Sequence, residues 1–274
     1  MRKVVGRVKK TVVRVVALDM IFLLLLIVAG AFSGVLSEII YVSAYLVPLA
    51  VFPWLSRGNA LMRLSPRMKR TDILLCLPLI APTLGATVGL SALVSYLLSF
   101  AGMGGTEMLT GSFFELLILH VLLPAVLEEA LFRYVHLSLI APHSRKSAVL
   151  ISALIFAVAH CNVAQIPYAF VAGIIFAVLD LACGSILPSV VLHLLNNLAS
   201  VFWLWDVSAP VFRVPFIAAV AALSVLSLGL VVILRRRYAK GALFLFDKND
   251  TISATREVWV FVAVCLALAV GALF

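Results

Sequence analysis

Five polar side chains with the chemistry of a hydrolase stand inside long apolar segments of this sequence. They are Glu128, Glu129, His160, His193 and Asn197. A carboxylate and a histidine can activate a water molecule, and a second histidine with an amide can stabilise an oxyanion. A charged side chain at the centre of a bilayer costs roughly 2.5–3.5 kcal/mol or more, so such residues usually mark a site. The set therefore suits the hydrolysis of an acyl bond.

The two adjacent glutamates differ in their helical surroundings. Arg133 follows Glu129 by four residues, which places both on one helix face in the order that favours an ion pair. Glu128 projects about 100° away from Glu129 and lacks that partner. We therefore predict that Arg133 neutralises Glu129 as a supporting pair and that Glu128 accepts a proton. The alternative is a buried ion-pair network that only locks helices together.

The histidines lie on two later apolar segments. Phe156 and His160 share one helix face, and so do His193 and Asn197. Taken singly, each has an ordinary explanation, as a packing residue or as an interhelical hydrogen bond. Taken together with the carboxylates, they favour a site assembled from three helices. His136 follows Glu129 by seven residues on a similar face, and we expect it to support the network.

The same groups also have the chemistry of a metal site. Glu128, His160 and His193 could hold a zinc ion and leave one position open for water. The sequence has no HExxH or GxGD motif, and the nearest approach to GxSG is AFSG at residues 31–34. A divalent metal is therefore an alternative to a glutamate-activated water, and the sequence leaves both open.

Composition predicts the framework for these residues. The chain has 274 residues, of which 64% are hydrophobic and 12% are charged, with a mean hydropathy of +1.20. These values predict an all-α, polytopic membrane bundle. The net charge of +9 is gathered in short clusters between apolar blocks, as in cytoplasmic loops that face anionic lipid. No nucleic-acid-binding motif accompanies these clusters, so nucleic acid is not an expected partner.

Apolar blocks suggest eight or nine transmembrane helices. They run over residues 15–35, 38–55, 73–100, 113–141, 147–162, 168–187, 189–205, 214–234 and 258–274. The first is expected to be an uncleaved anchor. A cytoplasmic amino terminus places every basic cluster inside, which predicts a multi-pass protein of the plasma membrane. We divide the chain into amino-terminal helices (1–112), core helices (113–205) and carboxyl-terminal helices (206–274).

The segments EEALFR, FAVAH and HLLNN resemble the motifs EExxxR, FxxxH and HxxxN of the CPBP intramembrane proteases. This is the CAAX protease and bacteriocin-processing group, also called Abi. All three motifs occur in order within residues 128–197. The resemblance implies that Glu128 and His160 activate the water and that His193 and Asn197 stabilise the intermediate or bind metal. Glu129 and Arg133 would be the supporting pair.

The resemblance also implies an intramembrane endopeptidase, whose partners are the lipid bilayer and a membrane-tethered peptide or protein. Basic loops and a Sec-style anchor are typical of bacterial proteins, which favours pheromone or leader peptides over prenylated substrates. The alternatives are a proton-coupled transporter and a non-catalytic immunity or scaffold protein. The oligomeric state is not specified.

Simple helices place the site residues at different depths. With 1.5 Å per residue, Glu128, His160 and His193 differ by roughly 10–15 Å along the membrane normal. A catalytic site nevertheless requires their side chains to meet, within about 12 Å of one another. We therefore predict that one of the helices is tilted, broken or displaced, and Pro124, one turn before Glu128, could kink its own helix.

Overall fold

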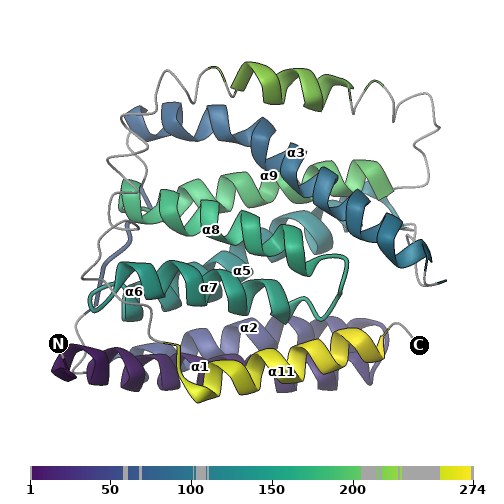
Figure 1. The fold of residues 1–274 in the computed structure, drawn as a ribbon. Helices are drawn as coiled ribbons and strands as arrows, with labels where there is room; N and C mark the ends of the chain where they lie inside the picture. The colour runs from purple at the N-terminus through teal and green to yellow at the C-terminus, as the bar shows by residue number, and fades with distance from the viewer. Residues whose placement is uncertain are drawn as a thin grey trace.

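A computed structural model of the chain is helical throughout the residues that it describes (Figure 1). These are residues 2–57, 61–67, 70–100, 111–204, 218–227 and 254–272, with the single residues 102, 109, 215 and 229. Ser65 and Ser185 form an isolated bridge, and no extended strand occurs among the described residues. The predicted all-α class is confirmed for this part of the chain.

The helices follow one another with short connections. They are α1 (Arg2–Gly30), α2 (Val35–Leu55), α3 (Arg70–Phe100), α4 (Phe113–Leu116), η1 (Leu117–Leu122), α5 (Leu123–Glu128), η2 (Glu129–Val135), α6 (His136–Ile140), α7 (Arg145–Ala159), α8 (Ile166–Cys183), α9 (Leu187–Leu204) and α11 (Arg256–Gly271). A further helix covers Ala218–Ser227. The segments η1 and η2 are π-helical.

Four of the described helices are long and apolar enough to cross a membrane. They cover Val8–Gly30, Val35–Leu55, Cys76–Phe100 and Ile166–Cys183. The helices Leu187–Phe202 and Ala218–Ser227 are apolar but shorter. The expected crossing over residues 214–234 is described only in part. The basic cluster at residues 235–240 lies outside the described residues.

The apolar block over residues 113–141 is not one regular helix. Two π-helical stretches interrupt it, and Pro124 lies in the first turn of α5 directly after the first of them. Proline has no backbone N–H and crowds the preceding turn, so a wide turn before it relieves the clash. Single π turns inside α-helices are frequent at functional sites.

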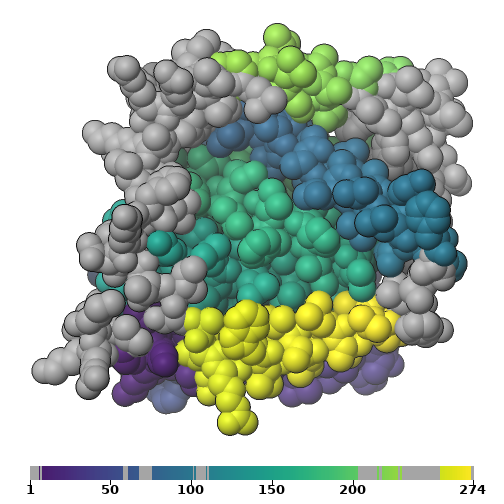
Figure 2. All heavy atoms as spheres, viewed as in Figure 1, coloured from purple at the N-terminus to yellow at the C-terminus, as the bar shows by residue number. Residues whose placement is uncertain are grey.

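The helices lie roughly side by side in successive layers (Figure 1). Helices α1, α2 and α11 form one side of the molecule, and α5, α6 and α7 follow. Helices α8, α9 and α3 come next, and the helix Ala218–Ser227 lies on the other side of the molecule. Figure 2 shows α11 lying across the front of α1 and below the central helices. The site segment is therefore enclosed between the α1–α2 hairpin and helices α7 to α9.

Small residues bring α7 and α8 close together. A Cβ atom at Gly173 would lie 3.0 Å from Cα of Ala153 and 3.4 Å from a ring carbon of Phe156. Such close approach through small residues is typical of helix packing in membranes. Ser152 of α7 also donates its hydroxyl to the backbone oxygen of Phe132 in η2. These contacts hold the helix that carries His160 against the helix that carries the glutamates.

Candidate active site

The predicted pair of Glu129 and Arg133 is present and sealed from solvent. Nε of Arg133 lies 3.2 Å from Oε2 of Glu129, and both side chains have no exposed surface. Two aromatic rings cover the guanidinium, with its carbon 4.1 Å from the ring centre of Phe156 and 5.6 Å from that of Phe176. A buried cation over an aromatic face is attracted to the ring. The ion pair is therefore a rigid support for the residues that pack around it.

Glu129 also orients His193 from the opposite side of its carboxylate. Nδ1 of His193 lies 2.7 Å from Oε1 of Glu129, a distance typical of a charge-assisted hydrogen bond. The N–H of Nδ1 donates to the carboxylate, so Nε2 faces away from Glu129. Phe176 stacks on this imidazole with ring centres 5.7 Å apart. Each oxygen of Glu129 thus holds one cationic or polar partner.

His160 is oriented by the backbone of its own helix. It is the residue that ends α7, and its Nδ1 lies 2.8 Å from the backbone oxygen of Phe156. Donation from Nδ1 to that oxygen leaves Nε2 without a proton in the neutral ring. The ring of Phe156 packs edge-on against the imidazole at 4.9 Å between centres. Phe156 thus supports His160 through both its ring and its backbone.

The two imidazoles converge on one oxygen of Glu128. Oε2 of Glu128 lies 3.9 Å from Nε2 of His160 and 3.8 Å from Nε2 of His193. The predicted convergence is confirmed, because these distances are far below 12 Å. Oε2 is buried and has no hydrogen-bond partner within the described chain. One oxygen and two ring nitrogens therefore face one another at separations below 4 Å.

Partial exposure distinguishes this group from its support. The side chains of His160 and Glu128 are 21% and 11% exposed, whereas those of Glu129 and Arg133 are fully buried. The Glu128 side of the cluster is therefore the more exposed one. The Glu129 side belongs to the packed interior.

A tyrosine that the sequence did not single out also contacts Glu128. The hydroxyl of Tyr45 in α2 donates to Oε1 of Glu128 at 3.4 Å, and the hydroxyls of Tyr41 and Tyr45 lie 3.4 Å apart. Two tyrosines at i, i+4 in an apolar helix are an ordinary packing pattern. The sequence signal for a functional role of Tyr45 was therefore weak, and only the packing of α2 against α5 reveals its contact with Glu128.

Asp180 of α8 bonds to the next helix. Its two carboxylate oxygens accept from the backbone N–H of Ser189 at 3.1 Å and from the hydroxyl of Ser189 at 2.7 Å. Asp180 lies in the last turn of α8, which is capped by Gly184 with a left-handed φ of 63°, and Ser189 lies at the start of α9. This connection fixes the first turn of α9, four residues before His193.

Two other predicted residues occupy different surroundings. Asn197 lies one turn after His193 on α9 and is partly exposed. His136 was expected to support the Glu129 network, but it contacts α1 instead. Its Nε2 lies 3.0 Å from Oδ1 of Asp19. The π-helical turns of η2 rotate His136 toward α1, away from the face that helical periodicity predicts.

The zinc alternative was tested on the arrangement of ligands. Among the residues that the structure describes, no group of three or more His, Cys, Asp and Glu side chains is placed to hold a metal ion. The predicted set has suitable donor types, but its separations of 3.8 and 3.9 Å are also those of groups around a water molecule. We derive no step through a metal.

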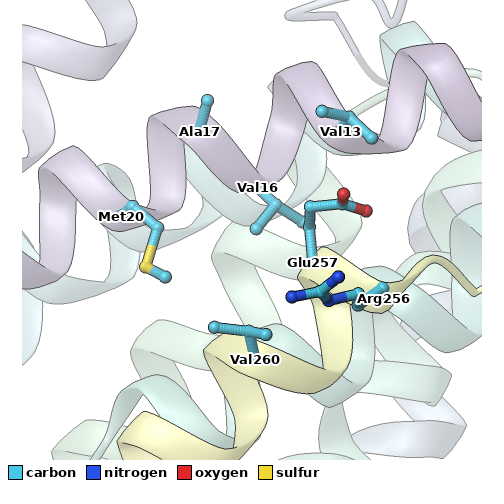
Figure 3. Close-up of a pocket in the computed structure, with 7 residues that line it drawn as sticks. All are labelled: Val13, Val16, Ala17, Met20, Arg256, Glu257 and Val260. Atoms are coloured by element: carbon cyan, nitrogen blue, oxygen red, sulfur yellow. The ribbon is translucent and has the colours of Figure 1, made fainter.

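A separate groove of about 310 Å³ lies on the outside of the bundle, between α1 and α11 (Figure 3). Its lining residues are Val13, Val16, Ala17, Met20, Arg256, Glu257 and Val260. None of them belongs to the cluster around Glu128. The groove is therefore distinct from the candidate active site.

Comparison with known proteins identifies the segment that carries this geometry. Residues 110–199 match a family model described as type II CAAX prenyl endopeptidase Rce1-like. The match covers about a third of the chain and includes every candidate residue from Glu128 to Asn197. It confirms the resemblance to CAAX-type intramembrane proteases over this segment and supports a peptidase activity. No curated protein and no solved structure gives a match.

Proposed function

We propose that this protein is an intramembrane endopeptidase that hydrolyses a peptide bond in a membrane-tethered peptide or protein. The observation that carries the proposal is the convergence of His160 and His193 on the buried, unsatisfied Oε2 of Glu128, whose side chain is partly exposed. The similarity of residues 110–199 to CAAX-type endopeptidases supports the same reaction class. A glutamate-activated water, with no metal, is the mechanism that we propose.

Glu128 acts as the general base in this mechanism. A water molecule between Oε2 of Glu128 and Nε2 of His160 attacks the scissile carbonyl carbon, and Glu128 takes a proton from it. The carbonyl electrons move to the oxygen, which becomes an oxyanion. When the intermediate collapses, the carbon–nitrogen bond breaks and the proton held by Glu128 passes to the leaving amine. Water has then been divided between the two products.

His193 and Asn197 stabilise the oxyanion. Donation by His193 requires a proton on Nε2 in addition to the one that Nδ1 donates to Glu129. Asn197, one turn further along α9, supplies an amide donor.

We place the reaction in the plasma membrane, within a multi-pass protein of eight or nine helices whose amino terminus is cytoplasmic. The basic amino-terminal segment and basic loops support this orientation. Peptide pheromones, leader peptides and regulatory membrane proteins are the substrates that we propose first. A prenylated carboxyl terminus is the second substrate class, on account of the family match.

The test is cleavage by purified full-length protein in proteoliposomes. The panel holds a farnesylated peptide with a carboxyl-terminal CAAX sequence, its unprenylated form, and leader peptides tethered by an apolar helix. Wild type is compared with Glu128→Ala, His160→Ala and His193→Ala, with mass spectrometry of the products. We expect cleavage by wild type and a loss of roughly 10²–10⁴-fold in each variant.

Cleavage that all three variants retain would overturn the proposal. Uptake of protons or solute into the vesicles that depends on Glu128, without cleavage, would favour the transporter alternative. A parallel arm with chelator tests the metal: retention of activity is expected, and its loss with recovery on added zinc would replace the glutamate-only mechanism.

A further inference from the structure

The matched segment does not supply every contact of the proposed general base. Glu128 has two carboxylate oxygens, and the histidines of residues 110–199 face only Oε2. The other oxygen, Oε1, accepts from Tyr45 of α2, which lies 83 positions earlier in the chain. Thus a helix outside the matched segment reaches the candidate active site.

Tyr45 is itself held in place by packing. Its side chain is 3% exposed, and its ring lies 4.8 Å from that of Phe22 in α1. Phe22 in turn packs edge-on against Phe132 of η2, with centres 5.4 Å apart. Because α1 and η2 both fix this aromatic group, the hydroxyl of Tyr45 has little freedom to move away from Glu128.

The directions of the Tyr41–Tyr45 and Tyr45–Glu128 hydrogen bonds follow from which groups carry a hydrogen to donate. An ionised carboxylate can only accept, so the hydroxyl of Tyr45 must donate to Oε1. Its own oxygen is then available to accept, and the hydroxyl of Tyr41, 3.4 Å away, is the donor within reach. The two hydroxyls therefore form a chain that ends on Glu128.

We propose that Tyr45, oriented by Tyr41, is a positioning residue that anchors Oε1 of Glu128 and directs Oε2 toward His160 and His193. A buried carboxylate with one anchored oxygen has one free oxygen in a defined direction. That oxygen is the one that takes the proton from water in the proposed function, on which this inference rests. The α1–α2 hairpin is thereby part of the catalytic unit.

The test measures kcat and KM for Tyr45→Phe, Tyr41→Phe and the double variant, in proteoliposomes. The probe is the peptide of the panel above that wild type cleaves fastest. Tyr45→Phe keeps the ring that packs on Phe22 and removes only the oxygen. We expect kcat to fall about 10–100-fold, as for other residues that orient a functional group, with KM changed less than about 3-fold.

The double variant tests the chain of hydroxyls. Tyr41→Phe alone should lower kcat about 3-fold, because one neutral hydrogen bond to the anchor is lost. In the Tyr45→Phe background it should change kcat by less than about 2-fold, since Tyr41 reaches Glu128 only through Tyr45. If the kcat losses of the two single variants instead multiply in the double variant, the proposed chain of hydroxyls is wrong.

Tyr96→Phe is the matched control. Tyr96 lies on α3, is 62% exposed and packs on Phe100 with ring centres 4.8 Å apart. It should cleave as wild type does, and all variants should keep the wild-type melting temperature within a few degrees. Wild-type kcat in Tyr45→Phe, alongside an inactive Glu128→Ala, would overturn this inference alone. Cleavage that survives Glu128→Ala would instead overturn the proposed function.

Discussion

The Glu128 cluster and the Asp19–His136 pair are both buried carboxylate–histidine contacts, and Glu128 and His136 are only eight residues apart. In the first, two imidazoles lie 3.8 and 3.9 Å from one oxygen, and the side chains are partly exposed. In the second, the contact is 3.0 Å and neither side chain has any exposed surface. The same residue types thus occur in an open and in a closed arrangement.

The difference between the two contacts distinguishes a cluster that can react from a contact that only joins helices. A direct hydrogen bond in a sealed interior joins α1 to α6, but it leaves no room for a reacting molecule. Contacts near 4 Å leave an acceptor unsatisfied, which is unfavourable unless water or substrate occupies the space. Distance and access, more than residue identity, therefore distinguish the candidate active site from the structural pair.

The largest effect is expected from Glu128→Gln. This change removes the proton acceptor while keeping the size of the side chain, so peptide cleavage should fall roughly 10²–10⁴-fold. The free energy of unfolding should change by less than about 1 kcal/mol, because the histidines are not directly bonded to Glu128. Denaturation in mixed micelles measures it. A fall in stability with retained cleavage would make the cluster structural.

A comparable effect, on stability, is expected from Arg133→Met. The change leaves the carboxylate of Glu129 buried without its cation, which should lower the free energy of unfolding by about 3–5 kcal/mol. The matched control adds Glu129→Gln to the same variant and should restore part of that loss. If the double variant is no more stable than Arg133→Met, the ion pair is not what holds this region.

Asp19→Asn should have a smaller effect. It weakens the hydrogen bond to His136 and should lower the free energy of unfolding by about 1–2 kcal/mol. Cleavage should stay within about 3-fold of wild type, because Asp19 has no contact with the Glu128 cluster. Kinetics at saturating peptide check this. A loss of more than 10-fold would show that the two pairs act as one unit.

The smallest effect is expected from Phe156→Leu. The ring over the Arg133 guanidinium is lost, which should destabilise the protein by about 0.5–2 kcal/mol. Cleavage should decrease only a few-fold, because the backbone oxygen that orients His160 remains. Phe52→Leu is the control, since Phe52 packs on Tyr134 with ring centres 5.7 Å apart and covers no cation. Equal losses in both would show that general packing explains the effect.

Local periodicity explains which features were predictable. The Glu129–Arg133 pair depends on residues one helical turn apart, and such a pair forms in any helix that contains them. The end of α8 is likewise a local feature, because Gly184 adopts the left-handed conformation that ends this helix. We expected His136 to share a helix face with Glu129, on the assumption of a regular α-helix. The π-helical turns of η2 lie between the two residues and change the direction in which His136 projects.

The sequence by itself determined the helical class with apolar helices of membrane-spanning length, the three motifs and the different surroundings of the two glutamates, because hydropathy and residue spacing act within single helices. Only the tertiary structure decided which atoms meet. It set Oε2 of Glu128 beside two imidazoles, closed Asp19 onto His136, and brought Tyr45 to Oε1. These contacts join residues distant along the chain, and they depend on helix packing and on irregular turns that periodicity does not encode.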